Sequence, residues 1–284
     1  MTIKTHCGFE SRQGNSRHDE RDLLKKVNAM KLDRVTLTGA DDSVNVDDLL
    51  KLSEQYPFVE WGILVHNATI ATSVSEWSPR WPSQAWIIEL QAKVRNWYPE
   101  TMLSLHVCGR WVRELLQGRQ LIPRFMFDQF NRVQLNFHAE NTPCDGVGFC
   151  KALQSIGGNR QFIFQIDGQG GNEHLETLWD VADGLNIHID TVPLFDVSGG
   201  AGVVPDVWPK PTWMANDIDY VYHGYAGGLG PDNVISELER IRAVAGTCRI
   251  WIDMETKIRS KGDSQFDLDL CHRVLQQVAP YIAK

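Results

Sequence analysis

Two glycine clusters follow consecutive strand-like segments, residues 188–196 and 219–223. Glycine lets the backbone adopt positive φ and approach a ligand closely. The second cluster leads into a segment of helical character, residues 232–245, and backbone N–H groups at a helix N-terminus favour an anion such as phosphate. Tight turns alone are the alternative, because Gly-Gly pairs are common in turns. The pairing of the clusters favours a phosphate site built from Gly199, Gly200, Gly202, Gly227 and Gly228.

Polar and titratable side chains gather where eight strand-like segments end, and few equivalents occur where those segments begin. In a (β/α)8 barrel the loops that follow the strands carry the chemistry, so this asymmetry indicates an active-site mouth. In chain order the residues are Thr38, Asp41 and Asp42; His66 and Asn67; His106 and Cys108; Asn136, His138 and Glu140; Gln165, Asp167 and Gln169; Asp196; His223; and Asp253, Glu255 and Lys257.

Strand-like and helical segments alternate along the chain, which predicts βαβ units and a parallel sheet. Eight repeats favour a closed barrel over an open doubly wound sheet, whose Gly-x-Gly-x-x-Gly signature is missing after the first strand. The predicted fold is an α/β, (β/α)8 TIM barrel over residues 34–284, a single domain with an N-terminal extension, residues 1–33, that carries a helix at 19–30. Strands are expected at 34–39, 59–65, 102–107, 132–138, 161–167, 188–196, 219–223 and 249–255, and helices at 47–55, 83–96, 110–117, 145–155, 173–183, 232–245 and 266–279.

Two of these strands carry polar residues at alternate positions, and alternate positions share one face of a strand. If those faces pointed outward, many polar groups would need partners under the helices, so we expect both faces to point into the barrel. There His106 and His138 would bind a ligand or hold a hydrogen bond, and catalysis is the alternative. The residues concerned are Ser104, His106 and Cys108, and Gln134, Asn136 and His138.

A divalent metal is the alternative use of the histidines at the mouth, since His and carboxylate sets on barrel strands bind zinc or manganese. No local histidine spacing supports such a site, and a serine nucleophile elbow is absent. We therefore expect no cofactor. A metal site, if present, would draw on His66, His106, His138, Asp167 and His223.

Composition limits the class of partner. The chain has 284 residues, a net charge of −8 and a pI near 5.6, which argues against nucleic acid or an anionic membrane as an electrostatically bound partner. No apolar run approaches the ~20 residues of a membrane span, and no signal peptide is recognisable. We expect a soluble, cytoplasmic protein with a small, anionic substrate; the sequence does not indicate an oligomeric state.

Several motifs resemble phosphoribosylanthranilate isomerase, a barrel enzyme of tryptophan biosynthesis, over roughly residues 34–275. The most specific is Ala226-Gly227-Gly228-Leu229-Gly230-Pro231-Asp232-Asn233-Val234, which is similar to the family's Ala-Gly-Gly-Leu-x-Pro-Glu-Asn-Val. The others resemble its first strand (Arg34–Gly39), its Ser-x-Arg-Tyr-Val-Ser (Ser78–Ser83), its Val-Gln-Leu-His (Val133–Asn136), its Leu-Leu-Asp with Gly-Gly-x-Gly (Leu194–Gly202) and its final Val-Asp (Ile252-Asp253).

The resemblance implies an Amadori-type isomerisation, in which an acid opens an aminoribose ring and a base moves a proton from C2. Asp196 matches the family's acid. Thr38 stands at the position of the cysteine base, so Asp41, Asp42 or Cys108 is expected to supply a relocated base. Arg80 would hold an anionic or ring substituent. The loop Glu255-Thr256-Lys257 replaces the family's Ser-Ser-Gly, with Lys257 as the compensating phosphate ligand.

Three hypotheses about function follow. The first is a divergent, isomerase-like barrel enzyme that acts on a phosphorylated, sugar-like molecule and does not carry out the tryptophan-pathway reaction itself. In it Asp196, Thr38, Asp41 and Cys108 would be catalytic, with Arg80, Asn136, His106, His138 and His223 binding the substrate. The second is a lyase or hydrolase that uses a His/Asp rim, with or without a metal. The third is a barrel that binds a small ligand without turnover.

Overall fold

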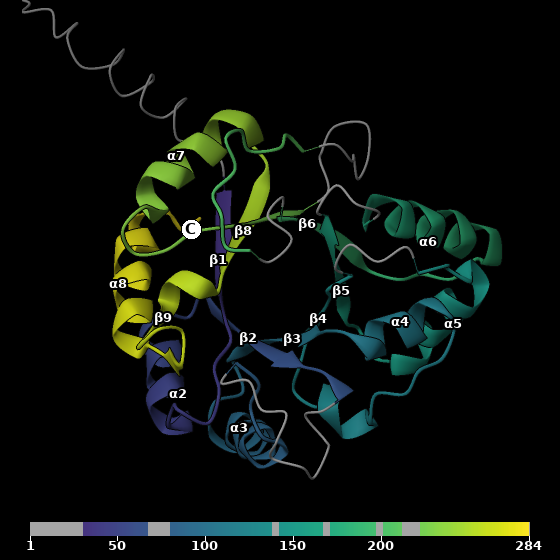
Figure 1. Cartoon of the computed structure of the whole chain (residues 1–284), viewed down its shortest axis with the longest axis horizontal. Coiled ribbons are helices and arrows are strands. Elements are labelled where there is room, and N and C mark those ends of the chain that lie inside the picture. Colours follow the sequence, from purple (N-terminus) through teal and green to yellow (C-terminus); the bar gives the residue numbers. More distant parts are fainter. Residues whose placement is uncertain are drawn as a thin grey trace, which may run out of the picture.

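The computed structural model describes residues 31–67, 80–137, 142–166, 171–196, 201–211 and 222–283. Eight parallel strands in this part of the chain close into a barrel in chain order, and helices lie outside it (Figure 1). The predicted (β/α)8 barrel is therefore confirmed. The strands are β1 (Lys31–Thr38), β2 (Val59–Val65), β3 (Met102–Val107), β4 (Arg132–Leu135), β5 (Gln161–Ile166), β6 (Thr191–Asp196), β7 (His223–Ala226) and β8 (Arg249–Met254).

Four of the helices begin where the sequence supplies a side-chain cap. Asn45, Ser83, Asp145 and Asp267 each accept a hydrogen bond from a backbone N–H of the following helix, an interaction that stabilises a helix by about 1 kcal/mol. Each helix predicted between residues 47 and 279 is present, with its ends shifted by at most two residues. They are α2 (Val46–Gln55), α3 (Gln84–Trp97), α4 (Arg110–Leu116), α5 (Gly146–Ile156), α6 (Gly171–Leu185), α7 (Val234–Ala245) and α8 (Leu268–Val278).

Strands β2 and β3 have the predicted bounds, whereas β4, β5 and β8 end one to three residues earlier than predicted and β6 begins three residues later. The differences in β1 and β7 matter most for the barrel. Strand β1 begins at Lys31, which pairs with Arg249 of β8, so the barrel starts before residue 34. Strand β7 covers His223–Ala226 and not 219–223. Its Gly224 reads as a turn residue in the sequence, but here it makes room inside the barrel, because a Cβ would lie 2.3 Å from the indole of Trp251. The expected helix at 19–30 lies outside the described residues.

Alternate strand residues face the helices and form the main apolar core. The residues that face the barrel axis divide into two halves. Strands β1 to β4 contribute polar side chains, among them Thr36, Glu60, His106 and Arg132. Strands β5 to β8 contribute a small apolar cluster made of Ile163, Val192, Leu194, Ala226 and Trp251. Below the carboxyl ends of the strands, one side of the interior therefore makes hydrogen bonds and the other packs closely. At those ends, β5, β6 and β8 also contribute polar side chains, Gln165, Asp196 and Asp253.

A buried ion cluster lies inside the barrel around Glu60. Arg132 donates to Glu60 Oε1 at 2.8 Å, Arg34 donates to Oε2 at 3.1 Å, and the Thr36 hydroxyl donates to Oε1 at 2.8 Å. The guanidinium carbon of Arg132 also lies 4.2 Å from the ring centroid of Trp251. Burial opposes the charge of Glu60, but Arg132, Arg34 and Thr36 outweigh it and lower the pKa of this carboxyl.

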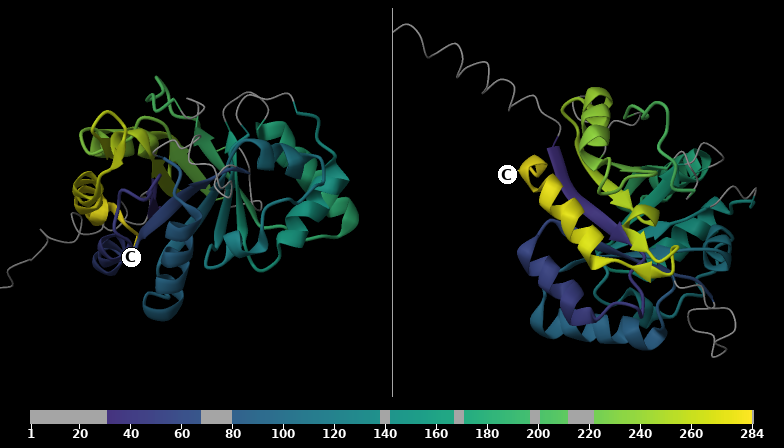
Figure 2. Two further views of the ribbon diagram at one scale, coloured as in Figure 1. Left: turned by 60° about the horizontal axis from the view of Figure 1, so that its bottom comes forward. Right: turned by 60° about the vertical axis from the view of Figure 1, so that its left-hand side comes forward.

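The chain ends next to the strand with which the barrel begins. Ile282 forms a parallel bridge with Leu32, and the Ala283 N–H donates to Leu32 O at 2.8 Å. Figure 2 shows that α8, which precedes this contact in the chain, lies beside β1. Within the described residues, no helix combines the length and the apolar character that crossing a membrane requires.

Candidate active site

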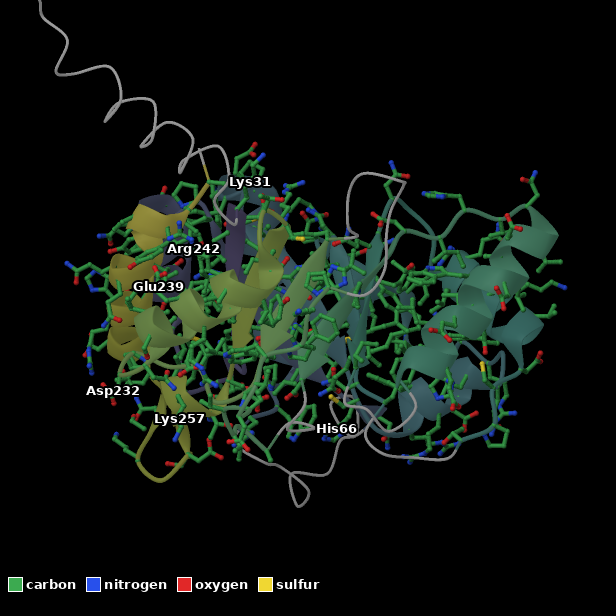
Figure 3. The ribbon with its side chains drawn as sticks, turned by 90° about the horizontal axis from the view of Figure 1, so that it is seen from above. Lys31, His66, Asp232, Glu239, Arg242 and Lys257 are labelled. Carbon is green, nitrogen blue, oxygen red and sulfur yellow. The ribbon has the colours of Figure 1, made fainter. Side chains whose placement is uncertain are left out.

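A cavity of about 180 Å³ opens at the carboxyl ends of the strands. Figure 3 shows His66 and Lys257, which follow β2 and β8, at one end of the barrel and Lys31, where β1 begins, at the other. This is the end at which barrel enzymes carry their active sites. The predicted site residues that line the cavity are Thr38, Arg80, His106, Cys108, Asn136, Asp196, Gly202, Gly227, Gly228 and Lys257.

Asp253, the inward-facing residue near the end of β8, is a carboxyl group of this cavity whose pKa lies far above its ordinary value. Its side chain is buried, and the Thr38 hydroxyl donates to its Oδ1 at 2.7 Å. Burial raises the pKa of Asp253 to about 8, and the nearby carboxylates Glu255 and Asp196 act in the same direction, against the hydrogen bond from Thr38. A carboxyl with such a pKa exchanges protons near neutral pH, as a general acid or base must.

Asp196 is the last residue of β6 and faces the same cavity. Gln165 Nε2 donates to its Oδ2 at 2.8 Å. Asp196 and Asp253 are the Cα partners of Ala226, one on each side, in the strand pairing of β6, β7 and β8. With about 4.8 Å between neighbouring strands, the two Cα atoms lie about 10 Å apart. Both carboxyl groups therefore border the space above the small side chain of Ala226.

Thr38 and His106 meet above Gly62 of β2. A Cβ on Gly62 would lie 2.3 Å from Thr38 Oγ1 and 2.9 Å from His106 Nε2, so glycine is required for both side chains to occupy their places. His106 is 1% exposed. Burial lowers its pKa to about 3, with a further contribution from Arg132 that Glu60 opposes. The imidazole is therefore neutral at any ordinary pH.

Cys108, Asn136 and Gln134 form a hydrogen-bonded row along β3 and β4. Gln134 Nε2 donates to Asn136 Oδ1 at 2.9 Å, and Asn136 Nδ2 donates to Cys108 Sγ at 3.1 Å. Burial raises the pKa of the Cys108 thiol to about 12. The expectation that Cys108 acts as a base is not supported, because a thiol with this pKa stays protonated. The expectation that these strand faces point into the barrel is confirmed for residues 106, 108, 134 and 136.

Arg80 reaches the cavity but is held by carboxylates of the protein. It donates through Nη1 to Glu255 Oε1 at 2.5 Å, through Nε to Asp263 Oδ2 at 2.9 Å, and through Nη2 to the same Asp263 oxygen. Glu255 does line the cavity, beside Lys257. Burial raises the pKa of Glu255, although Arg80 lowers it. An anionic substituent would therefore have to compete with Glu255 and Asp263 for Arg80.

The described part of the glycine clusters forms one side of the cavity. Gly202 and Gly228 have φ of +67° and +63°, and a Cβ on Gly228 would lie 2.9 Å from Gly202 O. A Cβ on Gly202 would lie 3.0 Å from Thr256 Oγ1 in the loop after β8. Three loops that follow consecutive strands therefore pack together with their backbones close. Gly199 and Gly200 lie outside the described residues.

Two residues expected at the site lie elsewhere. Asp41 does not line the cavity: its Oδ2 accepts from Arg259 Nη2 at 2.8 Å, and that guanidinium also donates to Gly39 O. Asp41 thus forms a buried ion pair that joins the loops after β1 and β8. This position does not support the expectation that Asp41 is the relocated base. His223 is the first residue of β7, not its end, and stacks on Phe195 at 5.4 Å between ring centroids. His223 does not line the cavity, so its place does not support the expectation that it binds substrate.

His138 and Asp167, two of the residues considered for a metal site, lie outside the described part of the chain. Among the residues that the structure does describe, no three His, Cys, Asp or Glu side chains are grouped as metal ligands. The site that remains is a cavity with three acidic groups, Asp196, Asp253 and Glu255, a neutral histidine and a row of amides.

No protein-family model matches the chain, and a search of curated proteins finds no match. The site must therefore be interpreted from its own geometry. Three residues of the cavity had been expected at the mouth or on an inward strand face but had been given no catalytic or binding function: Asp253, Gln134 and Gln165. Each was visible as a polar residue at an inward strand position, but the sequence does not show that Thr38 would donate to Asp253 or that Gln165 would hold Asp196.

Proposed function

We propose that this protein is an isomerase-like barrel enzyme that moves a proton on a small, phosphorylated, sugar-like substrate, in a reaction other than that of the tryptophan pathway. The observation that carries the proposal is the pair of carboxyl groups Asp196 and Asp253 at one cavity, with the pKa of Asp253 raised to about 8. Two carboxyls in different environments are the usual means by which one site supplies both an acid and a base.

Asp253 takes the role of base that the resemblance assigns to the position of Thr38. Thr38 donates its hydrogen to Asp253, so its oxygen orients the carboxyl and does not accept the substrate's proton. When ionised, a carboxylate with a pKa of about 8 is a stronger base than an ordinary aspartate. Asp196, held by Gln165, remains the acid that the resemblance implies.

The glycine side of the cavity is the proposed phosphate site. Gly202, Gly227 and Gly228 all adopt positive φ, a conformation in which backbone N–H groups can turn towards an anion. Lys257 adds a positive charge at the same side. Glu255 would repel a phosphate, but its pairing with Arg80 at 2.5 Å reduces that repulsion.

Deuterium exchange tests the proposal without knowledge of the product. Ribose 5-phosphate and other aldose and ketose phosphates would be incubated with the protein in D2O, and proton NMR would follow loss of the C2 hydrogen signal of the aldoses and of the C1 hydrogens of the ketoses. We expect exchange with at least one of these ligands and a loss of about 10²–10⁴-fold in its rate in Asp253→Asn. Asp48→Asn, an exposed change on α2, is the matched control. No exchange with any member of the panel, or undiminished exchange in Asp253→Asn, would contradict the proposal.

A further inference from the structure

Three buried polar atoms that border the cavity have no hydrogen-bond partner among the described residues: His106 Nε2, Gln134 Oε1 and Gln165 Oε1. Their side chains are at most 5% exposed. Buried polar groups are normally hydrogen-bonded, and leaving one unpaired costs about 1–3 kcal/mol. Three such atoms on neighbouring strands β3, β4 and β5 therefore indicate a surface that a ligand completes.

The hydrogen bonds already made decide what each group can offer. Gln134 and Gln165 donate through Nε2 to Asn136 and Asp196, which leaves their oxygens as acceptors. The Thr38 hydrogen is directed to Asp253. A ligand oxygen on this wall needs a donor, and among the three unpaired atoms only His106 Nε2 can carry a hydrogen.

His106 is also positioned next to the acid–base group. Its Nε2 and Thr38 Oγ1 lie 2.9 Å and 2.3 Å from the same point, the Cβ position of Gly62, so the two atoms are neighbours. Thr38 in turn contacts Asp253 at 2.7 Å. A substrate atom that gives its proton to Asp253 would therefore have its adjoining oxygen within reach of His106.

We propose that His106 is a neutral hydrogen-bond donor whose Nε2–H binds the substrate oxygen on which negative charge develops. The inference rests on the proposed function. The C–H bond next to a carbonyl breaks, its proton moves to the Asp253 carboxylate, and its electron pair forms the C=C bond of an enediolate. The carbonyl oxygen gains the charge and accepts the hydrogen bond from His106. The proton on Asp253 then bonds to the former carbonyl carbon through the electron pair of the C=C bond. The hydroxyl hydrogen on the other carbon moves to the charged oxygen, and the O–H electron pair it leaves behind forms the new C=O bond, so that atoms and electrons balance.

A neutral donor suits this step. Charge is stabilised most effectively by donors that are already oriented in a site from which water is excluded. Glu60 of β2 and Arg132 of β4 act on His106 in opposite directions, and burial keeps the ring neutral.

The protonation state of His106 in the free protein is the first test. Nitrogen-15 NMR of histidine-labelled protein distinguishes the imidazolium and the two neutral tautomers, and the signal missing in His106→Gln identifies this ring among the nine histidines. We expect the neutral Nε2–H tautomer from pH 5 to 9. Protonation in this range, or the hydrogen on Nδ1, would overturn the proposal whatever the protein catalyses.

Ligand binding by variants is the second test. A five-carbon sugar-phosphate hydroxamate, which mimics an enediolate, would be compared with ribose 5-phosphate by calorimetry. In His106→Leu we expect the affinity for the hydroxamate to fall about 100-fold while that for ribose 5-phosphate changes by less than about threefold, and in His106→Gln we expect a smaller loss because the amide can donate. Equal losses for both ligands would show that His106 only shapes the cavity. If neither ligand binds the wild-type protein, the proposed function is contradicted. The nitrogen-15 NMR measurement then still tests whether His106 is a neutral Nε2–H donor.

Discussion

Glu60 and Asp253 are both buried carboxyl groups inside the barrel, and both are Cα partners of Thr36, one on β2 and the other on β8. Their pKa values nevertheless move in opposite directions. Glu60 is held by two guanidinium groups and a hydroxyl, which lower its pKa against the effect of burial. Asp253 has one hydroxyl, from Thr38, and burial raises its pKa to about 8.

The difference shows that partners, and not burial alone, decide what a buried carboxyl can do. Glu60 is fixed in its charged form and holds strands β1, β2 and β4 together through Arg34 and Arg132. Asp253 is left close to the point where it gains and loses a proton. A group with these properties beside a cavity is a functional-site candidate.

Removal of the Glu60 charge should have the largest effect on stability. In Glu60→Gln, the buried guanidinium of Arg132 and the half-buried one of Arg34 lose their common counter-charge, and we expect the free energy of unfolding to fall by about 3–5 kcal/mol. Urea denaturation at pH 7 would measure it. Asp48→Asn breaks an exposed pair with Lys51 and should cost less than about 1 kcal/mol. A loss in Glu60→Gln as small as in this control would mean that the cluster does not hold the strands.

The opposite result is expected for Asp253→Asn, which should abolish proton transfer and stabilise the protein. A carboxyl whose folded pKa is raised binds its proton more tightly in the folded state, so wild-type stability falls as the pH rises from the ordinary value of 3.8 to about 8. The variant lacks this loss. We expect its melting temperature to exceed that of the wild type by about 5 °C at pH 8 and to match it near pH 4. A variant that is less stable at pH 8 would contradict the raised pKa.

Acid should affect the two carboxyls differently. The pKa of Glu60 is lowered, so its contribution to stability is fully present above its ordinary value of 4.5 and is lost as the pH falls through the folded value. We expect wild-type stability below pH 4 to decline more steeply than that of Glu60→Gln. Thermal unfolding from pH 2 to 5 would show this, and parallel declines would argue against Glu60 as the cause.

Gly62→Ala tests the space that Thr38 and His106 share. The added Cβ would lie 2.3 Å from Thr38 Oγ1, and we expect a loss of stability of about 1–3 kcal/mol together with a loss of deuterium exchange. Gly184→Ala on α6 is the matched control, since a Cβ there meets nothing within 4 Å. Unchanged exchange in Gly62→Ala would mean that the contact between Thr38 and Asp253 does not matter for the reaction.

The smallest effect is expected when the threonine hydroxyl that donates to each carboxyl is removed. Thr38→Val removes the hydrogen bond that lowers the pKa of Asp253, so the midpoint of the pH–rate profile should move up by about one unit. Thr36→Val removes the equivalent bond to Glu60 and should leave that midpoint in place. Equal shifts in the two variants would remove the distinction between the carboxyls.

The sequence predicted the barrel because strand and helix patterns repeat. The structure adds that Asn45, Ser83 and Asp267 cap three of the helices. The sequence also placed Asp196, Asn136 and His106 at the mouth, since strand ends follow from strand boundaries. It misplaced His223, because the strand was expected to end at residue 223, whereas Gly224 continues the strand and makes space for Trp251. Nor could it show that Asp41 pairs with Arg259, 218 residues further along the chain.

The interpretation of the cavity depends most on the proton of Asp253. Carbon-13 NMR of the aspartate carboxyl groups, assigned by the signal missing in Asp253→Asn, would measure its titration directly in the free protein. We predict a midpoint near pH 8. A midpoint near the ordinary value of 3.8 would show that Asp253 is as fixed in charge as Glu60, and would contradict its role as the acid–base group of this site.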